Sequence, residues 1–433
     1  MRHTIDWIHP DFLNPEKLDE ETRRVFDICH GCRRCFNLCD TFPRLFDLID
    51  ASATGELESV KSADFAPAVE ACTLCDLCFT SKCPYVPPHE YNLDFPHLML
   101  RHRALEFSEG KVSTLRQMMA KTDVTGTVGK AVAPLANWAT KEGNALTRPI
   151  LEKALGLHRK AALPKFQSTT LVRQTRDPLP LNEKAPAFGR KAVIYATCYG
   201  NYNDQNIGLA TRKILAHNGV ETQVIYPGCC GMPVLEQGNI AAVAEAARRV
   251  STEFRSWIDQ GYEVIALVPS CALMLKSEWP LILPDDENVQ MLSHATRDIA
   301  EYLVGLSKDP GLAEGIQPLK EGVTVHIACH ARAQNIGQKA AELLRLIPDL
   351  DLQVIERCSG HGGAWGVMVE NFEVALKVGK PVAQQALKAK NRIVLSECPL
   401  AGTHIRQGME KLDEKAAVDI AHPIEIFAKA YGM

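Results

Sequence analysis

Three features that define other protein classes are missing from this sequence of 433 residues. No uninterrupted apolar run reaches the roughly eighteen residues that a membrane-spanning helix requires. No cluster of Lys and Arg occurs, and the formal net charge is −4, so nucleic acid is not an expected partner. The first residues, MRHTIDWIHPDF, lack the apolar core of a secretory signal. We therefore expect a cytoplasmic protein, which can at most be peripheral on the inner membrane face.

Nucleotide-binding motifs are also missing. The stretch GHGGAW at 360–365 would need glycine in place of Trp365 to complete a dinucleotide fingerprint, and no P-loop occurs. A flavin or nicotinamide site inside this chain is therefore not expected. Any substrate would be handled by another protein.

Cysteine, by contrast, is abundant and unevenly placed. The chain has 15 cysteines: eight lie within the first 83 residues, none lies between 84 and 197, and seven follow from 198 onward. An odd number of thiols, in a protein expected in the reducing cytosol, argues against a disulfide framework. Metal binding is the other common reason for closely spaced thiols.

The first eight cysteines form two motifs with the spacing of bacterial ferredoxins. The two motifs are Cys29-x2-Cys32-x2-Cys35-x3-Cys39 and Cys72-x2-Cys75-x2-Cys78-x4-Cys83-Pro84. Three thiolates at i, i+3 and i+6 wrap one face of a cubane, and the fourth points toward a second cluster. Zinc needs only four ligands, usually in two separated pairs, so the third cysteine of each run would be surplus. The pattern predicts two [4Fe–4S] clusters rather than zinc or buried structural cysteines.

In two-cluster ferredoxins the fourth cysteine of each run ligates the other cluster. This rule assigns cluster one to Cys29, Cys32, Cys35 and Cys83, and cluster two to Cys72, Cys75, Cys78 and Cys39. Two departures leave the ligands in place: Asp40 rather than proline follows the first motif, and one extra residue precedes Cys83. Residues 14–28 are typical of a capped amphipathic helix. The 32 residues between the motifs are typical of a helical insertion.

Residues 101–188 contain no cysteine and separate the two motifs from the second half of the chain. Residues 111–123 and 148–161 have helical spacing, and residues 162–170 are typical of a linker. Residues 125–141 are apolar, with many small side chains. The favoured interpretation of this stretch is a helix packed on its own protein, ahead of contact with a membrane surface or a partner.

From residue 189 the pattern changes to a duplicated α/β unit. Each copy has three expected strands, at 191–198, 221–227 and 263–271, then at 323–329, 352–360 and 392–398. The main helices are expected at 204–217, 239–259, 334–347 and 370–390. Cys198, Gly231 and Cys271 recur as Cys329, Gly360 and Cys398 at offsets of 131, 129 and 127 residues, which indicates a repeat. Apolar strands that alternate with helices predict parallel sheets covered on both faces, with every cysteine at the C-terminal end of a strand.

These cysteines carry a resemblance to a known family. Cys198, the Cys229-Cys230-Gly231 triplet and Cys271 resemble the CCG (cysteine-rich) domain found twice in the B subunit of heterodisulfide reductase. The same domain occurs in the iron–sulfur subunits of anaerobic glycerol-3-phosphate dehydrogenase and glycolate oxidase, which the chain resembles over nearly its whole length. The resemblance implies an α/β protein with four regions: a helical two-cluster ferredoxin-type domain (1–100), a helical linker region (101–188), a CCG domain with a parallel sheet (189–310) and a degenerate CCG-like repeat (311–433).

Both repeats depart from a full CCG site, which offers a first cysteine, an adjacent pair and a Cys-x-x-Cys. The first repeat has Val268 at the fifth position and keeps Cys198, Cys229, Cys230 and Cys271, which the resemblance implies as ligands of a third cluster, cubane or non-cubane. The second repeat has Ser359 and Leu395 in place of thiols and keeps Cys329, Cys358 and Cys398. It could bind a weaker cluster or zinc, with His330 or His361 completing the set, or be a vestigial fold with three free thiols.

We expect an electron-transfer iron–sulfur protein or subunit with no catalytic residue of its own. By resemblance, the electron donor is a flavoprotein dehydrogenase, and the acceptor is a quinone or another carrier. The alternative is a heterodisulfide-reductase-type catalytic subunit that cleaves a disulfide at a CCG-bound cluster, and the missing cysteines count against it. A cluster-bearing redox sensor would need a DNA-binding or signalling domain, which the sequence does not show.

Overall fold

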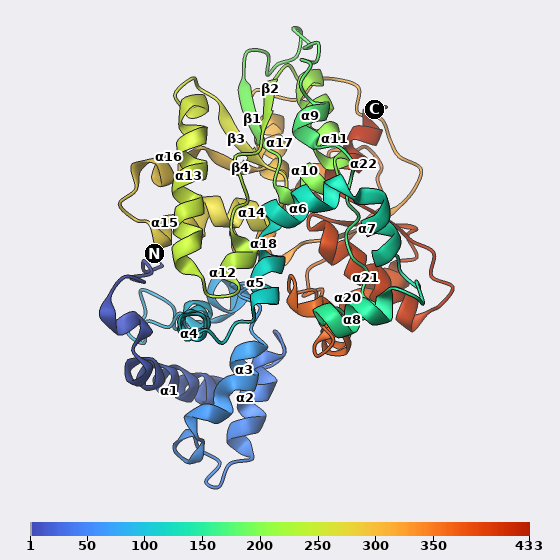
Figure 1. The fold of residues 1–433 in the computed structure, drawn as a ribbon. Helices are drawn as coiled ribbons and strands as arrows, with labels where there is room; N and C mark the ends of the chain where they lie inside the picture. Colours follow the sequence, from blue (N-terminus) through green and yellow to red (C-terminus); the bar gives the residue numbers. More distant parts are fainter. Residues whose placement is uncertain (1) are drawn as a thin grey trace.

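The computed structural model describes residues 2–433, and it begins with a helical region that carries both ferredoxin-type motifs. The helices of this region are α1 (Pro15–Cys32), α2 (Thr41–Asp50), α3 (Ala66–Glu70) and α4 (Phe95–Ser108), with shorter turns at Pro10–Leu13, Leu57–Ser59, Ser62–Phe65 and Cys78–Lys82. Figure 1 shows them, in blue, at one end of the molecule. Asn14 caps α1 by accepting the Lys17 N–H at 3.0 Å, which confirms the predicted capped helix. The predicted helical insertion between the motifs is also confirmed, by α2 and α3.

Short helices dominate the cysteine-free stretch that follows. They are α5 (Thr114–Ala120), α6 (Thr122–Ala131), α7 (Ala133–Thr140), α8 (Arg148–Leu155) and α9 (Leu171–Gln174). Helix α6 packs closely on the body through two glycines: a Cβ on Gly126 would lie 2.4 Å from the Tyr202 ring, and one on Gly129 would lie 2.4 Å from the Phe166 ring. Residues 125–141 therefore do pack on their own protein, as the sequence favours, but only along this glycine side.

The first α/β unit is built on a parallel sheet. Its strands are β1 (Lys191–Tyr195), β2 (Glu221–Ile225), β3 (Glu263–Ala266) and β4 (Thr296–Asp298), in the order β2-β1-β3-β4. Its helices are α10 (Cys198–Tyr202), α11 (Asn206–His217), α12 (Met232–Leu235), α13 (Ile240–Ile258), α14 (Pro269–Leu273), α15 (Trp279–Ile282), α16 (Glu287–Ala295) and α17 (Ile299–Lys308). Residues 192–195 of the central strand are all fully buried, because helices cover both faces of the sheet. The three predicted strands are confirmed, and the short edge strand β4 is an addition.

The second α/β unit repeats this order. Its strands are β5 (Val323–His326), β6 (Leu352–Ile355), β7 (Ile393–Ser396) and β8 (Asp419–Ala421), arranged as β6-β5-β7-β8 and all parallel. Its helices are α18 (Cys329–Ala333), α19 (Lys339–Leu344), α20 (Phe372–Ala389), α21 (Pro399–Leu412) and α22 (Pro423–Ala430). The helix predicted at 334–347 is shorter than expected, because Asn335 and Gly337 adopt left-handed backbone with φ of 55° and 83°.

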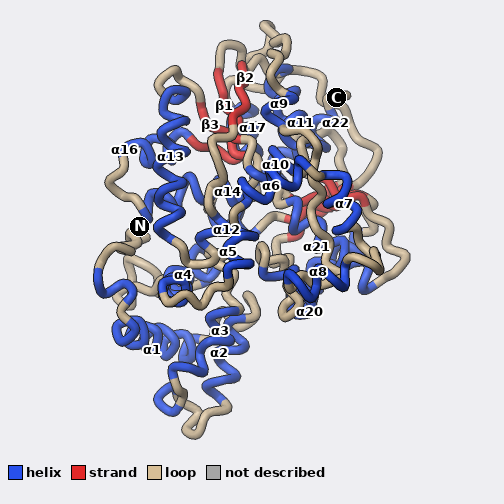
Figure 2. The backbone as a smooth tube through the Cα atoms, viewed as in Figure 1, coloured by secondary structure: helices blue, strands red, loops and turns tan. Residues whose placement is uncertain are grey.

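The two units are joined through their strand ends. Helices α14 and α18, which follow β3 and β5, pack against each other, and α22 of the second unit packs on α11 of the first. Figure 2 shows the two groups of strands as separate red clusters within the helices. One buried apolar cluster runs from α1 through both units, so the regions share a core, while the borders predicted between them stay predictions. In residues 2–433 no helix is long and apolar enough to cross a bilayer.

Candidate metal centres

The structure gathers the first predicted set of thiols around the end of α1. Cys29 and Cys32 lie in the last turn of that helix, which ends at Arg33 in left-handed backbone with φ of 51°. Burial and then the neighbouring thiol of Cys83 raise the pKa of Cys29 well above its usual value. Burial and the same Cys83 thiol raise the pKa of Cys35 to about 11. Cys83, which belongs to the second motif, therefore lies beside the first three thiols of the first motif.

Three thiols of the second predicted set, those of Cys72, Cys75 and Cys78, lie on the segment between α3 and α4. Leu74 and Asp76 take left-handed backbone with φ of 49° and 61°, which curls the loop. Burial and then the thiol of Cys72 raise the pKa of Cys39 to about 12. Burial raises the pKa of Cys78, and its neighbouring thiols contribute in the order Cys75, Cys72, Cys39 and Cys35. The last cysteine of the first motif thus lies with the first three of the second, and Cys35 brings the two sets next to each other.

The chemistry of these eight side chains fits iron–sulfur clusters. Each set offers four thiols and no carboxylate or imidazole, and soft thiolate donors are what such clusters require. In the part of the chain that the structure describes, no three His, Cys, Asp or Glu side chains converge closely enough to hold a single metal ion. The thiols of each set neighbour one another. Which of them ligate stays a prediction.

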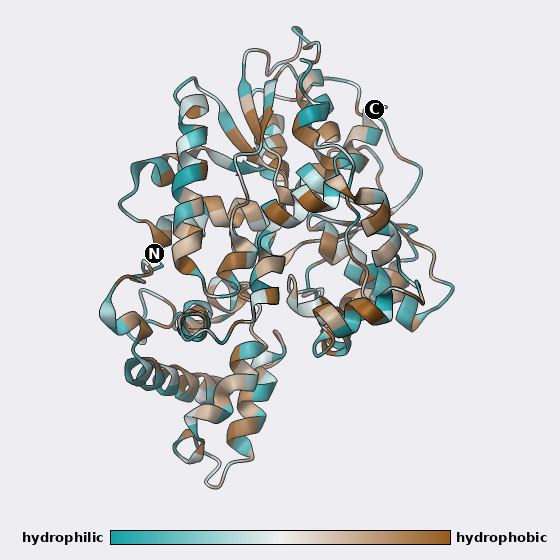
Figure 3. Ribbon diagram, viewed as in Figure 1, coloured by the Kyte–Doolittle hydropathy of each residue, from teal (hydrophilic) through white to brown (hydrophobic). Residues whose placement is uncertain are grey.

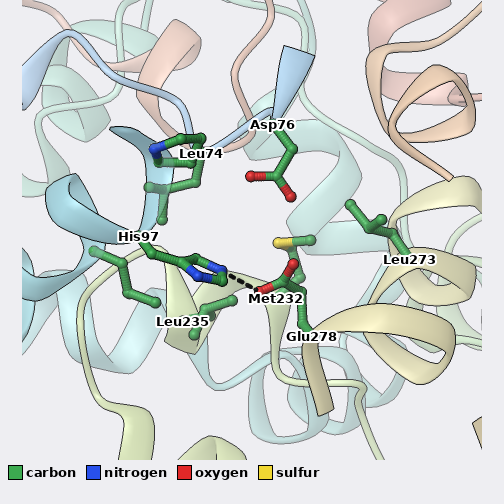
Figure 4. Close-up of a pocket in the computed structure, with 9 residues that line it drawn as sticks. Leu74, Asp76, His97, Met232, Leu235, Leu273 and Glu278 are labelled. Carbon is green, nitrogen blue, oxygen red and sulfur yellow. Dashed lines mark hydrogen bonds and ion pairs between the residues drawn. The ribbon is translucent and has the colours of Figure 1, made fainter. Parts of the chain in front are cut away.

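A buried ionic network fastens the second motif to the rest of the protein. Arg2 donates to both carboxylate oxygens of Asp76 at 2.9 and 3.0 Å, to Asp94 at 2.7 and 2.9 Å, and to Glu278 at 3.2 Å. His97 bridges Asp94 at 3.1 Å and Glu278 at 3.2 Å. Figure 4 shows His97 and Glu278 joined across a small pocket, with Asp76 on its far side. The network therefore links the N-terminal arm, the cysteine loop, α4 and the first α/β unit.

The charges of this network are perturbed by burial and by one another. Burial raises the pKa of Asp76 to about 6, with Arg2 opposing and Glu278 reinforcing the shift. Burial and Arg2 act to lower the pKa of His97, but Asp94 and Glu278 raise it to about 9. Burial opposes ionisation of Glu278, yet Arg2 and His97 lower its pKa to about 2. Sequence reasoning missed this network, although Asp76 stands inside the second motif, where a charged residue needs a buried partner.

The first α/β unit brings its four predicted thiols together. Cys198 begins α10, the Cys229-Cys230 pair follows β2, and Cys271 lies in α14 after β3. Hydrogen bonds from the Cys198 and Cys230 thiols lower the pKa of Cys229. Hydrogen bonding to Cys229 and then to Cys271 raises the pKa of Cys230, and burial reinforces the shift. All four therefore meet at the C-terminal edge of the sheet, as the sequence predicts.

Helix α6 covers this first thiol site. Asp123, in its first turn, accepts the Cys229 N–H at 3.2 Å and the Tyr226 hydroxyl. Burial and the Cys198 and Cys229 thiols raise the pKa of Tyr226. No feature of the sequence connects residues 101–188 with this site. No local sequence pattern predicts this contact, because 106 residues separate Asp123 from Cys229.

The second α/β unit gathers its three remaining thiols in the same way. Burial and then the thiols of Cys358 and Cys398 raise the pKa of Cys329. Leu395 is fully buried in β7, and Ser359 is buried beside Cys358. Of the two histidines considered for this site, His330 contacts Ser270 Oγ of the first unit through Nδ1 at 2.8 Å.

His361, the other candidate, is buried near His404, with ring centroids 5.8 Å apart. Neither ring nitrogen of His361 has a hydrogen-bond partner among the described residues. Burial and then His404 lower its pKa to about 3, so the ring is neutral. The structure therefore leaves both histidines near the second unit's cysteines, without assigning either to a metal.

Thiols from different parts of the chain lie near one another. Burial raises the pKa of Cys75, and the thiols of Cys329 and Cys358 in the second unit raise it further. Among the neighbours that raise the pKa of Cys398, after burial and Glu397, is Cys271 of the first unit. Thiols of the second unit therefore lie near Cys75 of the second motif and near Cys271 of the first unit. No spacing within the sequence indicates these neighbours.

Comparison with known proteins identifies the two α/β units. Residues 192–276 and 323–406 each match the family of CCG cysteine-rich domains. The chain therefore contains two CCG cysteine-rich domains, which follow the thiol-rich helical region.

Several individual proteins are also similar in sequence to this chain. It is homologous to the C subunit of anaerobic glycerol-3-phosphate dehydrogenase from Escherichia coli K12, with 26% identity over 316 residues, which cover 72% of this chain and 76% of the relative. The B subunit of fumarate reductase (CoM/CoB) from Methanothermobacter marburgensis is 26% identical over 249 residues, or 56% of this chain and 47% of that one. An iron–sulfur protein of Methanocaldococcus jannaschii is 29% identical over 256 residues, or 58% and 47%.

Proposed function

We propose that this chain is the electron-transfer iron–sulfur subunit of an oxidoreductase complex. The observation that carries the proposal is the exchange of fourth cysteines between the motifs: Cys83 lies with the first set, and Cys39 with the second. That arrangement is the one that two adjacent ferredoxin-type clusters need. The homologues support the same role, because they are subunits of dehydrogenases and reductases.

In this proposal the thiol sets have distinct roles. Cys29, Cys32, Cys35 and Cys83 hold one [4Fe–4S] cluster, and Cys72, Cys75, Cys78 and Cys39 hold another. When bound, such clusters supply one-electron carriers whose potentials depend on burial and hydrogen bonding. The four thiols of the first CCG domain suit a third cluster, and the three of the second CCG domain lie near Cys75 and Cys271. The protein's own contribution is to fix these positions, chiefly through the Arg2 network and the shared core.

The partners follow from the relatives. Because the Escherichia coli relative is a dehydrogenase subunit, we propose a flavoprotein dehydrogenase as electron donor. A quinone or another carrier would accept the electrons. The absence of a dinucleotide fingerprint or P-loop from this sequence agrees with a donor site on another protein.

The alternative is a catalytic subunit that reduces a disulfide at a CCG-bound cluster, and one relative is named for the thiols CoM and CoB. The positions where a full site would have further thiols are filled by Val268, Ser359 and Leu395, of which Leu395 is a fully buried strand residue. An apolar side chain packed in a sheet cannot take a ligand's place. The electron-transfer role is therefore the better supported of the two.

Metal analysis of protein purified without oxygen tests the proposal. We expect about eight irons from the two motif sets and up to about twelve if the first CCG domain is occupied, with electron paramagnetic resonance signals of reduced [4Fe–4S] clusters. Cys230→Ser should lower the higher value to about eight. Cys358→Ala, as the matched change in the second CCG domain, should leave the iron content unchanged and cost roughly 1 kcal/mol in packing.

Two results would contradict the proposal. Stoichiometric zinc with only trace iron would remove the electron carriers. Rapid reduction of a thiol heterodisulfide by the chemically reduced protein, lost in Cys230→Ser, would establish the catalytic alternative instead.

A further inference from the structure

One buried histidine connects parts of the chain that lie far apart in the sequence. His330 follows Cys329 at the start of α18 and is 8% exposed. Its Nδ1 lies 2.8 Å from Oγ of Ser270 in α14, and 60 positions separate the two residues. Because Ser270 immediately precedes Cys271, this hydrogen bond joins the cysteine-bearing turns of the two CCG domains.

The same imidazole lies next to the second ferredoxin-type motif. Burial lowers the pKa of His330 to about 4, and Glu278 and then weak hydrogen bonding to the Leu74 backbone oppose that shift. Nε2 otherwise has no hydrogen-bond partner among the described residues. Leu74 immediately precedes Cys75, whose thiol also lies near that of Cys329. A neutral ring is therefore placed between a turn of the second motif and a turn of the first CCG domain.

Helix packing holds the imidazole in place. Helices α14 and α18 pack against each other. Gln334, one turn beyond His330, donates to the His330 carbonyl at 3.3 Å and reaches the Pro269 carbonyl at 3.5 Å. Lys276 in turn donates to Gln334 at 3.1 Å. Figure 3 shows hydrophobic segments, in brown, around α14. Hydrogen bonds in such surroundings are stronger than they are in water, so the ring keeps one arrangement.

The loop of the second motif is also fixed relative to α14. Arg2 donates both to Asp76, two residues beyond Leu74, and to Glu278 of the first unit. Leu74 from the loop and Leu273 from α14 line the same small pocket (Figure 4). The two cysteine-bearing turns are therefore held at a constant separation, which the imidazole spans.

We infer that His330, together with Ser270, is the electron-coupling bridge between the cluster of the second motif and the cluster of the first CCG domain. Electrons pass between buried centres more readily through bonded and hydrogen-bonded atoms than across a gap, and the protein's part is to position such atoms. The path leaves the second motif through Cys75 and Leu74. It crosses the imidazole to Ser270 and ends at Cys271.

The electron balance of this step is simple. One electron that moves along the path oxidises the cluster at one end and reduces the cluster at the other, and the imidazole stays neutral throughout. His330 is thus a positioning residue rather than a catalytic one. The inference deepens the proposed electron-transfer function and rests on it.

A competing path would cross the thiols of the second CCG domain. Cys329 lies near Cys75, and Cys398 lies near Cys271. Cys329 and Cys398 also influence each other, but within residues 2–433 no hydrogen bond joins them. The path through the imidazole has a hydrogen bond of 2.8 Å at that point, and we therefore favour it.

Flash photoreduction of the full-length protein, purified with its clusters, tests the bridge. Photoexcited deazaflavin, with EDTA as the sacrificial donor, delivers less than one electron per protein. The electron should enter at the first set, whose four thiols are all partly buried, whereas three of the four in the first CCG domain are buried. Freeze-quench electron paramagnetic resonance then follows the rise of the signal from the first CCG domain, and a rate that does not depend on protein concentration is intramolecular.

Two variants interrupt the bridge from opposite ends. Ser270→Ala and His330→Phe should each slow the intramolecular rise several-fold, while the iron content and the midpoint potentials of the clusters stay unchanged. Ser270→Thr keeps the hydroxyl group and should restore the rate. In thermal unfolding, the combined Ser270→Ala, His330→Phe variant should lose less stability than the sum of the two single losses, because both remove the same hydrogen bond.

Two control variants should leave the rate unchanged. His404→Phe replaces a buried histidine of the same unit, whose ring lies near those of His361 and Phe372 and not at α14. Cys398→Ala removes a thiol from the competing path. Together they separate the bridge from a general loss of packing in the second CCG domain.

Four outcomes would overturn the inference. They are unchanged rates in both bridge variants, a slower rate in Cys398→Ala, a shifted midpoint potential that accounts for the slower rate, and only about eight irons in the unchanged protein, since one end of the path would then be missing. Each of these leaves the proposed electron-transfer function in place. Zinc instead of iron would contradict that function itself.

Discussion

Replacing Arg2 with methionine should destabilise the protein far more than its place near the start of the sequence suggests. The side chain is 11% exposed, makes hydrogen bonds to three carboxylates and lies over the Phe79 ring at 4.6 Å. Removing it would leave Asp76, Asp94 and Glu278 with His97 as their one remaining cation in the network. Removing one partner from a buried ion pair costs about 3–5 kcal/mol, which we expect for Arg2→Met near neutral pH.

The pH dependence of this loss in stability distinguishes the removal of a charge from the loss of packing contacts. Asp76 already has a pKa raised to about 6, and without the guanidinium, which lowers it, that pKa would rise further. The unfolded chain has an Asp pKa of about 3.9, so the folded variant binds the proton more tightly, and its stability increases as the pH falls through the folded pKa. His97, with a pKa near 9, and Glu278, near 2, do not titrate between pH 5 and 8. The deficit relative to the unchanged protein should therefore be largest at about pH 8 and smaller at about pH 5.

Thermal unfolding followed by circular dichroism, at several pH values, measures this effect. A loss of about 3–5 kcal/mol corresponds to a lowering of the melting temperature by roughly 3–6 °C, since about 2.1 cal/mol/K per residue gives about 0.9 kcal/mol/K for the whole chain. The control is Arg24→Met, which removes an exposed arginine paired with Glu21 at 2.7 Å and should cost at most about 1 kcal/mol. Equal losses for the two variants, or a deficit for Arg2→Met that stays constant with pH, would refute the reasoning.

Two further predictions concern the cluster ligands in the two motifs and the packing of α6. If ligation is crossed, Cys39→Ser should damage the cluster built mainly on the second motif, and Cys83→Ser should damage the cluster built on the first. In each variant the other cluster should still give its electron paramagnetic resonance signal. Loss of the same signal in Cys39→Ser and in a first-motif variant would mean uncrossed ligation. Gly126→Ala would bring a Cβ to 2.4 Å from the Tyr202 ring, so we expect a loss of about 1–3 kcal/mol in chemical denaturation. Gly305→Ala, in α17 with no atom within 4 Å of the new Cβ, should instead stabilise by about 0.5–1 kcal/mol, and similar values for both glycines would count against the packing described for α6.

Much of the fold could be predicted because it depends on local order in the chain. Helix α1 could be predicted from its capping asparagine and its apolar period. The strands could be predicted from short β-branched runs. The parallel character of the two sheets followed from strands that alternate with helices, and the repeat followed from three landmarks at nearly constant offset. The order of the strands in each sheet was not predicted. The least accurate helix, at 334–347, was interrupted by left-handed backbone at Asn335, which no apolar period reveals.

The sequence by itself indicated which side chains are candidates for binding clusters, because the spacing of thiols within each run is a local property of the backbone. Tertiary structure alone decided how these groups meet: Cys75 beside the second CCG domain, Cys398 beside Cys271, and Arg2 among three distant carboxylates. It also decided the orientation of α6, whose apolar period is equally compatible with a buried or an outward side. The close packing of two glycines against aromatic rings fixes the orientation of α6. Contacts of this kind join segments that are far apart in sequence. They depend on the packing of the whole chain, so no local spacing predicts them.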